Sequence, residues 1–403
     1  MKSFIRLGRF LRRSSPARVQ KPSNFPILDP ATKVEEERMP AYDRGLYYPV
    51  KFGDIFHSRY QVLSKLGFGA NSTVWFCRDL EQHRYTAMKI YIKNSRANQE
   101  VRVLEHISRT KTQHPGSNLV RRMIDNFELS GPSDSHQCIV HEPLLTSLLH
   151  FQAALDAKSL PEDLLKGALQ QLLEALDFLH SEAQVIHTDI QAKNIIISAM
   201  DDSIFREWEV NERTEPSPRK VDNGYTVYRS RSFHLKKGWS GYGMPLLSDF
   251  GEARIGKVHN GLIQPDIYRA PEVILGLKWT SKVDIWNVGA LIWDLFEDHH
   301  LLDGRGPDGF HSDAHLLAEM IAMLGPPPAA FLHKSSYSLK YWDSGQWKSP
   351  REVPHDSLED SEEYLEGENK RMFLQFVRKM LRWDPEERQS ACDLLKDPWL
   401  TAH

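Results

Sequence analysis

The chain has 403 residues, 40% of them hydrophobic and 26% charged, and its formal net charge is −3. These values are ordinary for a soluble globular enzyme of one long or two medium domains, and the charge balance argues against direct binding of nucleic acid. No apolar run approaches the roughly 18 residues that span a bilayer, and the three cysteines are too far apart for a zinc site or a disulfide framework.

The first 28 residues are basic, because they contain seven lysines and arginines and no acid before Asp29. Their apolar residues could form a helix face opposite the arginines, which resembles a mitochondrial presequence. A disordered basic tail explains the same composition, and a nuclear or RNA-binding role is a lesser alternative. We expect residues 1–40 to be disordered. We also expect the protein in the cytoplasm, the nucleus or both, with the mitochondrion as the alternative.

Strand-like runs separated by turn residues begin at Tyr60 and predict a small sheet. The predicted strands are 60–63, 73–77, 85–90, 123–129 and 137–141, with one helix at 98–107. From residue 160 onward leucines recur at helical spacing, and Pro161 stands at a plausible helix start. Further helices are predicted at 274–296, 313–324 and 370–382.

This order of elements predicts an α+β fold with two lobes. The N-terminal lobe, at about 46–142, is β-rich with one helix, and the larger lobe, at about 146–402, is helical. A short junction near residues 143–145 would leave a cleft, where ligand sites tend to occur. A polar insert at 198–245 interrupts the larger lobe, and we expect it to be irregular.

A glycine-rich turn lies between the first two predicted strands. It reads Leu66-Gly67-Phe68-Gly69-Ala70-Asn71-Ser72-Thr73-Val74. Glycines let the backbone approach phosphates closely, although a Gly-x-Gly hairpin is more often only a turn. Its position 22 residues before Lys89, on the predicted strand Ala87-Met88-Lys89-Ile90, strengthens the phosphate-binding interpretation.

Three acceptor side chains give the most informative pattern in the chain. Asp189 and Asn194 lie in the segment His187-Thr188-Asp189-Ile190-Gln191-Ala192-Lys193-Asn194, and Asp249 follows in Ser248-Asp249-Phe250-Gly251. Phosphoryl transfer needs such a set: one carboxylate orients a hydroxyl nucleophile, and a carboxamide with a second carboxylate holds magnesium against the phosphates of ATP. The spacing matches the H-R-D-x-x-x-x-N and D-F-G signatures.

Further signatures follow in the same order. They are Tyr268-Arg269-Ala270-Pro271-Glu272, Asp284-Ile285-Trp286-Asn287-Val288-Gly289, and Arg388, which we expect to pair with Glu272. The chain therefore resembles eukaryotic protein kinases over about residues 46–402. It is most similar to the SR-protein kinases of the fungal type, through residues 48–54, residues 72–75, Thr188 before Asp189, and the insert.

The resemblance implies a bilobal protein kinase fold that binds ATP and Mg²⁺ and phosphorylates serine or threonine in basic, Arg/Ser-rich proteins. It makes Asp189 and Lys89 catalytic, makes Asn194 and Asp249 the metal ligands, and pairs Glu100 with Lys89, with Glu105 as the alternative. The ATP-binding residues that it implies are Leu66, Gly67, Gly69, Ser72, Val74, Ala87, Lys89, Glu100, Glu142 and Leu144. His187 is expected to brace the catalytic loop.

Gln191 departs from the family pattern, because serine/threonine kinases usually have lysine two residues after the catalytic aspartate. We expect Lys193 to supply the missing cation as a third catalytic residue. A pseudokinase that serves as a binding scaffold is the alternative, and a small-molecule kinase is a weaker one. The family also often has leucine where Phe250 stands, and its insert is much longer.

Charge gives the one clue to substrate outside the resemblance. Residues 356–368 contain seven acids and no base, and residues 294–313 contain six acids against Arg305. These stretches could bind basic substrates or could be solvated loops. The insert contains the opposite pattern, Tyr228-Arg229-Ser230-Arg231-Ser232, which could occupy an acidic groove as a pseudosubstrate.

Overall fold

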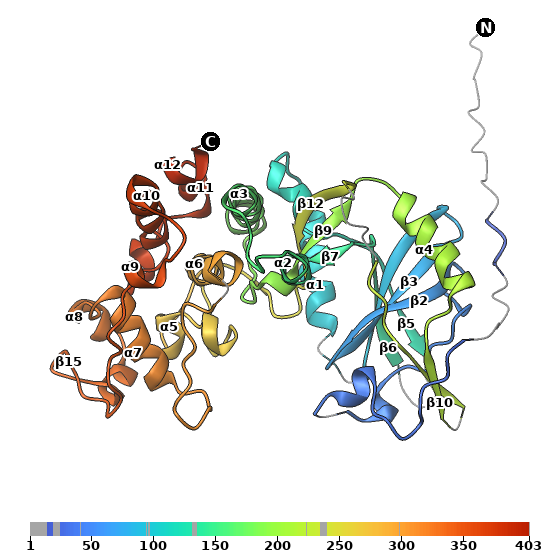
Figure 1. The fold of residues 1–403 in the computed structure, drawn as a ribbon, viewed down its shortest axis with the longest axis horizontal. Coiled ribbons are helices and arrows are strands. Elements are labelled where there is room, and N and C mark those ends of the chain that lie inside the picture. The colour runs from blue at the N-terminus through green and yellow to red at the C-terminus, as the bar shows by residue number, and fades with distance from the viewer. Residues whose placement is uncertain are drawn as a thin grey trace, which may run out of the picture. The chain divides into compact units, whose positions relative to one another are not determined.

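The computed structural model describes residues 14–18, 25–40, 42–93, 95, 97–130, 135–222, 224–233, 240–297 and 299–402. Most of the candidate presequence lies outside these residues. The chain forms two compact units (Figure 1). The smaller unit contains residues 1–97, 123–144 and 199–241, and the larger unit contains residues 98–122, 145–198 and 242–403.

The smaller unit is built on a six-stranded antiparallel sheet with the order β1-β2-β3-β4-β6-β5. Its strands are β1 Ile55–Phe56, β2 Tyr60–Gly69, β3 Ser72–Asp79, β4 Arg84–Tyr91, β5 Met123–Ser130 and β6 Ser135–His141. Apolar side chains that alternate along the strands form its core, among them Val62, Trp75, Met88 and Val140. Every strand predicted from the sequence is present.

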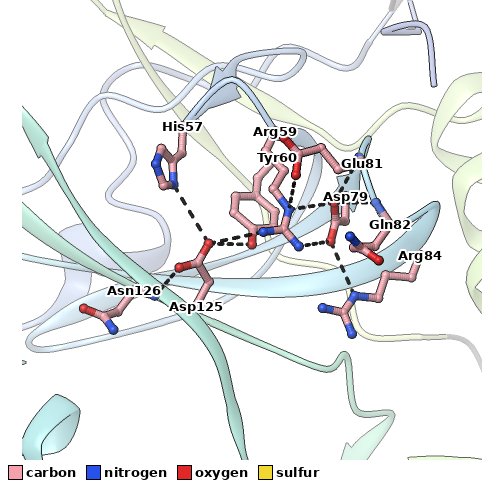
Figure 2. Close-up of polar contacts among 9 residues, drawn as sticks. All are labelled: His57, Arg59, Tyr60, Asp79, Glu81, Gln82, Arg84, Asp125 and Asn126. Carbon is pink, nitrogen blue, oxygen red and sulfur yellow. Dashed lines mark hydrogen bonds and ion pairs between the residues drawn. The ribbon is translucent and has the colours of Figure 1, made fainter. Parts of the chain in front are cut away.

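A polar network ties the outer part of this sheet together (Figure 2). The Arg59 guanidinium donates to both carboxylate oxygens of Asp79, at 2.9 and 2.8 Å, and lies 3.6 Å from Asp125. Tyr60 Oη donates to Asp125 over 2.8 Å. Burial alone would raise the pKa of Asp79, but the hydrogen bonds from Arg59 and from the backbone of the following turn lower it. The bidentate pair therefore fixes the end of β3 against β2.

The insert is part of the smaller unit and is regularly structured, so the prediction of an irregular segment within the larger lobe was wrong. It contains α4 Ser203–Thr214 and a hairpin of β10 Arg219–Asp222 and β11 Tyr225–Tyr228. Phe205 and Trp208 are buried: Phe205 packs against Phe76 of β3, and the Trp208 indole donates to Ser64 of β2 over 3.0 Å. Burial of this apolar helix face outweighs the polar composition.

The N-terminal residues 25–40 are also structured, which corrects the expectation of disorder up to residue 40. A 3₁₀ turn at Glu35–Arg38 places Glu36 with only 3% of its surface exposed, against the fully buried Lys65 of β2. Lys220 of the insert lies 2.7 Å from Glu37. Ion pairing to two buried lysines lets this acidic turn pack on the sheet.

The larger unit is mainly helical. Its helices are α1 Ala97–Arg109, α2 Leu148–Ala153, α3 Glu162–Phe178, α5 Pro271–Ile274, α6 Lys282–Phe296, α7 Asp313–Leu324, α8 Ala329–Leu332, α9 Leu358–Ser361, α10 Gly367–Arg378, α11 Ala391–Leu394 and α12 Pro398–Thr401. Its short strands are β7 Thr146–Ser147, β8 Val185–Ile186, β9 Ile195–Ala199, β12 Tyr242–Leu247, β13 Arg254–Ile255, β14 Trp342–Asp343 and β15 Gln346–Trp347. They pair as β12-β9-β7, β13-β8 and β14-β15.

Helix α6 is the centre of the larger unit, and it is buried on nearly all sides, including Trp286 and Trp293. The helix predicted at 274–296 is broken before it, because Gly276 has φ +65° and ends α5. Arg388 donates to both oxygens of Glu272 over 2.6 and 2.7 Å, which confirms the predicted pair. None of the described helices is long and apolar enough to cross a membrane.

Candidate active site

The loop from His187 to Asn194 connects β8 to β9 in the larger unit, and α6 fixes its start. Each carboxylate oxygen of Asp284 accepts one backbone N–H, from His187 and Thr188, both over 2.8 Å. Asp284 also lies 2.8 Å from His180 Nε2. Thr188 has φ +67°, a left-handed conformation that costs energy for a β-branched residue. This strained residue directly precedes Asp189 and so sets the direction in which the chain enters it.

Two amides hold the carboxylate of Asp189. Gln191 Nε2 donates to Oδ1, and Asn194 Nδ2 donates to Oδ2 over 2.8 Å. Burial raises the pKa of Asp189, and this effect outweighs the opposing influence of His187 and Lys193 and of the amide hydrogen bonds. The carboxylate therefore has a fixed orientation and a higher proton affinity than an exposed aspartate.

Asp249 joins this loop through the main chain. The backbone N–H of Ser248 donates to Asn194 O over 2.8 Å, and His187 Nε2 lies 3.1 Å from Ser248 O. His187 is fully buried, so it braces the loop as expected. Asp249 has φ +65°, and its side chain is exposed. The structure thus brings Asp189, Asn194 and Asp249 onto adjoining loops of one unit.

A cavity of about 610 Å³ lies beside this loop in the larger unit. Gln191 and Lys193 line it from the loop. The other lining residues are Leu149, Gln152, Ala153, Lys158, Ala192, Pro265, Ile267, Tyr268, Asp294, His299 and His300. A cavity that includes the residues around Asp189 is the place where a substrate side chain can reach the loop.

Asp294 is the one carboxylate in this cavity lining, and the sequence marks it only as part of the acidic stretch at 294–313. Tyr268 Oη donates to its Oδ2 atom, and His300 Nδ1 lies 2.7 Å from Oδ1. Burial and the carboxylate raise the pKa of Tyr268. The hydrogen bond with Asp294 raises the pKa of His300. Both neighbours can therefore act as hydrogen-bond donors to the Asp294 carboxylate.

Neutral hydrogen bonds hold part of the segment between Asp249 and Glu272. Thr188 Oγ1 donates to Glu252 O over 2.8 Å. Gln264, at φ +66°, donates to Val283 O over 2.9 Å and to Asn287 over 2.8 Å. No sequence pattern marks Gln264, because its partners become neighbours only in the folded chain.

The smaller unit contains most of the residues that we expect to bind ATP. The glycine-rich turn is the β2–β3 hairpin, with Gly69 opposite Ser72 and Gly67 opposite Val74. Lys89 of β4 is half-buried and lies opposite Val74 on β3.

The remaining smaller-unit residues of the ATP-binding set are Leu66, in the same hairpin, Ala87, which is buried on β4, and Glu142 and Leu144, which follow β6. Glu142 is exposed and Leu144 is buried.

Glu100 belongs to α1 in the larger unit, where it is 2% exposed. Its alternative, Glu105, lies 2.9 Å from Arg109 one helical turn further on. Burial of a carboxylate needs a specific partner. We therefore prefer Glu100 over Glu105 as the acidic residue of the expected lysine–glutamate pair.

Comparisons with known proteins all identify protein kinases as similar to this chain. The protein kinase domain family matches residues 60–400. A serine/threonine protein kinase of Aspergillus fumigatus is 74% identical over the whole of both chains. The serine/threonine-protein kinase SRPK of Physarum polycephalum is 30% identical over 91% of each chain, and human SRSF protein kinase 3 is 24% identical over 91% of this chain and 90% of its own. A solved kinase domain superposes with a TM-score of 0.67 and 22% identity, covering 89% of this chain and all of that one.

Proposed function

Because the chain belongs to the protein kinase domain family and is a serine/threonine protein kinase, we propose that it uses MgATP to phosphorylate serines of basic, Arg/Ser-rich proteins. The observation that carries the proposed mechanism is the oriented Asp189 carboxylate, held by two amides beside a cavity. Nothing in the comparisons favours the pseudokinase alternative.

In this mechanism Asp189 orients the acceptor hydroxyl and takes its proton as the new P–O bond forms. Gln191 occupies one oxygen of Asp189 and cannot supply positive charge. Lys193 is exposed, lines the same cavity and lowers the pKa of Asp189 against the effect of burial. It is therefore the cation that we expect to stabilise the charge on the transferred phosphoryl group.

Asn194 and Asp249 are the residues that would hold a divalent cation, which we propose to be Mg²⁺. Both offer oxygen ligands, the type that hard cations prefer. Asn194 Nδ2 already donates to Asp189, so Oδ1 is the atom that would bind the ion. Such an ion neutralises charge on the phosphates of ATP. In the smaller unit, the glycine-rich hairpin and Lys89 are the groups that we expect to bind those phosphates.

The substrate class rests on two observations. Two of the relatives are named as SR-type protein kinases, and Asp294 places one carboxylate in the cavity beside the catalytic loop. An arginine of the substrate can pair with this carboxylate. The acidic stretch at 356–368 contributes less than its composition suggests, because three of its acids pair within the chain, in Glu359–Arg378, Glu362–Lys370 and Glu368–Arg371.

Transfer of labelled γ-phosphate from ATP to an Arg/Ser-repeat peptide tests the proposal. A Lys/Ser peptide of equal charge is the control, because lysine cannot make the bidentate contact of arginine. We expect the arginine peptide to be preferred and Asp294→Asn to reduce that preference. Equal rates for both peptides would contradict the substrate class, and no transfer to either, or to a general basic protein, would contradict the catalytic assignment.

A further inference from the structure

An N-terminal strap holds the glycine-rich hairpin in the smaller unit. We define the strap as residues 34–40 and 42–47, which include 3₁₀ turns at Glu35–Arg38 and Arg44–Leu46. Tyr47, 5% exposed, directs its hydroxyl to the carbonyl oxygens of Gly69 and Ala70, 3.2 Å from each. These carbonyls are at the tip of the hairpin, so the strap fixes the position of the expected phosphate-binding turn.

A buried ion pair anchors the strap one residue before the glycine-rich sequence. Lys65 is fully buried in β2, and its ammonium pairs with Glu36 and lies 3.7 Å from Glu35. Removing carboxylates from a buried lysine is costly, because the charge is left without a partner. The position of the turn around Glu35 is therefore coupled to the strand that enters the hairpin.

The insert also contacts the strap. Asp222 pairs with Arg44 over 3.0 Å, and Lys220 lies 2.7 Å from Glu37. Ser230 Oγ donates to a carboxylate oxygen of Glu35. Ser230 thus connects the insert to the same turn that holds Lys65.

Ser230 stands between two arginines, Arg229 and Arg231, in the one Arg/Ser run of the insert. Arg229 is exposed and Ser230 is half-buried. The run is not free to act as a pseudosubstrate. The Arg231 guanidinium pairs with Glu212 over 3.1 Å, and the Arg231 backbone N–H donates to Lys65 O over 3.1 Å. Residues 229–233 have no regular structure, so these few contacts are what must open to present the serine.

We propose that Ser230 is a phosphorylation site of the enzyme itself and that its modification releases the strap from the glycine-rich hairpin. This inference rests on the proposed Arg/Ser specificity. The Ser230 hydroxyl oxygen would attack the γ-phosphorus of ATP, a P–O bond to Oγ would form as the bond to the β–γ bridging oxygen breaks, ADP would leave with that electron pair, and the hydroxyl proton would pass to Asp189.

Charge decides the consequence of the modification. Phosphoserine carries about −1.5 to −2 at neutral pH and no longer donates the hydroxyl hydrogen to Glu35. The phosphate would face the carboxylates of Glu35 and Glu36, and Lys65 already has both as partners. The closed contact therefore cannot form again once the serine is phosphorylated, and the modification stabilises the released strap. Weaker anchoring of Gly69 and Ala70 should raise the KM for ATP.

Phosphopeptide mapping after incubation with ATP tests the first half of the proposal. We expect phosphate on Ser230 in the wild-type chain and none in Asp189→Asn. A preparation that phosphorylates an Arg/Ser peptide but leaves Ser230 unmodified would overturn the inference while leaving the proposed function intact. If the same preparation fails on the peptide, the proposed function is contradicted as well.

Kinetics test the second half. Ser230→Glu should raise the KM for ATP about fivefold or more with kcat little changed, whereas Ser230→Ala should resemble the phosphatase-treated wild type. Ser232→Glu is the matched control, because Ser232 is exposed in the same run. Adding Glu35→Gln should partly restore the KM of Ser230→Glu. The phosphorylated and phosphatase-treated wild type should differ in the same direction, a comparison independent of whether Ser230→Glu folds. An equal KM in both forms would overturn the release.

Discussion

The two acidic residues of the candidate site should fail in different ways when their charge is removed. Asp189→Asn keeps the size of the side chain and its loop but removes the proton acceptor, so ATP binding should persist while turnover falls by orders of magnitude. Asp249→Asn should weaken binding of the metal–nucleotide pair. Titration calorimetry with ATP beside steady-state kinetics distinguishes the two, and full activity in Asp189→Asn would exclude it as the catalytic base.

Lys193 gives a second prediction at this scale. If it supplies the charge that Gln191 cannot, Lys193→Ala should raise the barrier by about 2–4 kcal/mol, and adding Gln191→Lys should restore the rate. Lys158→Ala is the matched control, because Lys158 is an exposed lysine of the same cavity lining. Equal rates for Lys193→Ala and Lys158→Ala would mean that Lys193 has no special role.

Local spacing explains why the chemical residues were predicted and their supports were not. Asp189 and Asn194 are five residues apart on one loop, so the sequence alone places them together. Asp294 and Gln264 acquire their roles from partners that are distant in sequence. The same is true of His187, whose Nε2 atom contacts Ser248 O and so braces the loop. A lone aspartate or glutamine carries no periodicity or motif from which such contacts can be inferred.

At the scale of elements, the segment between Asp249 and Glu272 should need no phosphate for activity. Thr188 stands where many kinases have the arginine that binds one, and residues 249–272 contain no serine or threonine. Gln264 and Thr188 provide neutral anchors instead. Phosphatase treatment should leave the rate on the Arg/Ser peptide unchanged at saturating ATP, whereas Gln264→Ala should lower it. A large loss after phosphatase treatment, mapped to this segment, would refute the prediction.

The insert shows what composition conceals about elements. Its charged and polar residues suggested an irregular segment, yet Phe205 and Trp208 lie three residues apart, with Ile204 beside them, and form one face of α4. Three apolar positions were too few to identify a helix, since the surface that buries them comes from β2 and β3. Strands β2 to β6 were predicted well because each has its own run of β-branched and aromatic residues.

At the scale of the whole molecule, the Arg388–Glu272 pair joins segments 116 residues apart, and both side chains are fully buried. Arg388→Met leaves Glu272 as a buried carboxylate without its partner, so it should destabilise the larger unit by about 3–5 kcal/mol. The double variant with Glu272→Leu should recover part of that loss. Urea unfolding measures both, and additive losses in the double variant would show that the pair does not couple.

Glu297 makes stability depend on pH. It is 5% exposed after α6, and burial, followed by repulsion from Glu362, raises its pKa to about 7. The folded chain therefore keeps a proton that the unfolded chain releases above its ordinary pKa of 4.5, so the stability that this group contributes is complete below that value and is lost as pH rises through about 7.

Replacing the Glu297 carboxylate with an amide removes the cost of ionising a buried group. At pH 8, Glu297→Gln should have a free energy of unfolding in urea about 1–3 kcal/mol higher than that of the wild type. The variant should also show a smaller decline of this free energy between pH 5 and 7. Glu363→Gln removes an exposed carboxylate that is a lesser cause of the raised pKa of Glu297, so it should reduce the decline only slightly. The prediction is contradicted if the stability of the wild type rises between pH 5 and 7 and Glu297→Gln does not change it. That result would show that the Glu297 carboxylate is ionised over this range, because the ion pair of Lys370 with Glu362 cancels the repulsion from Glu362.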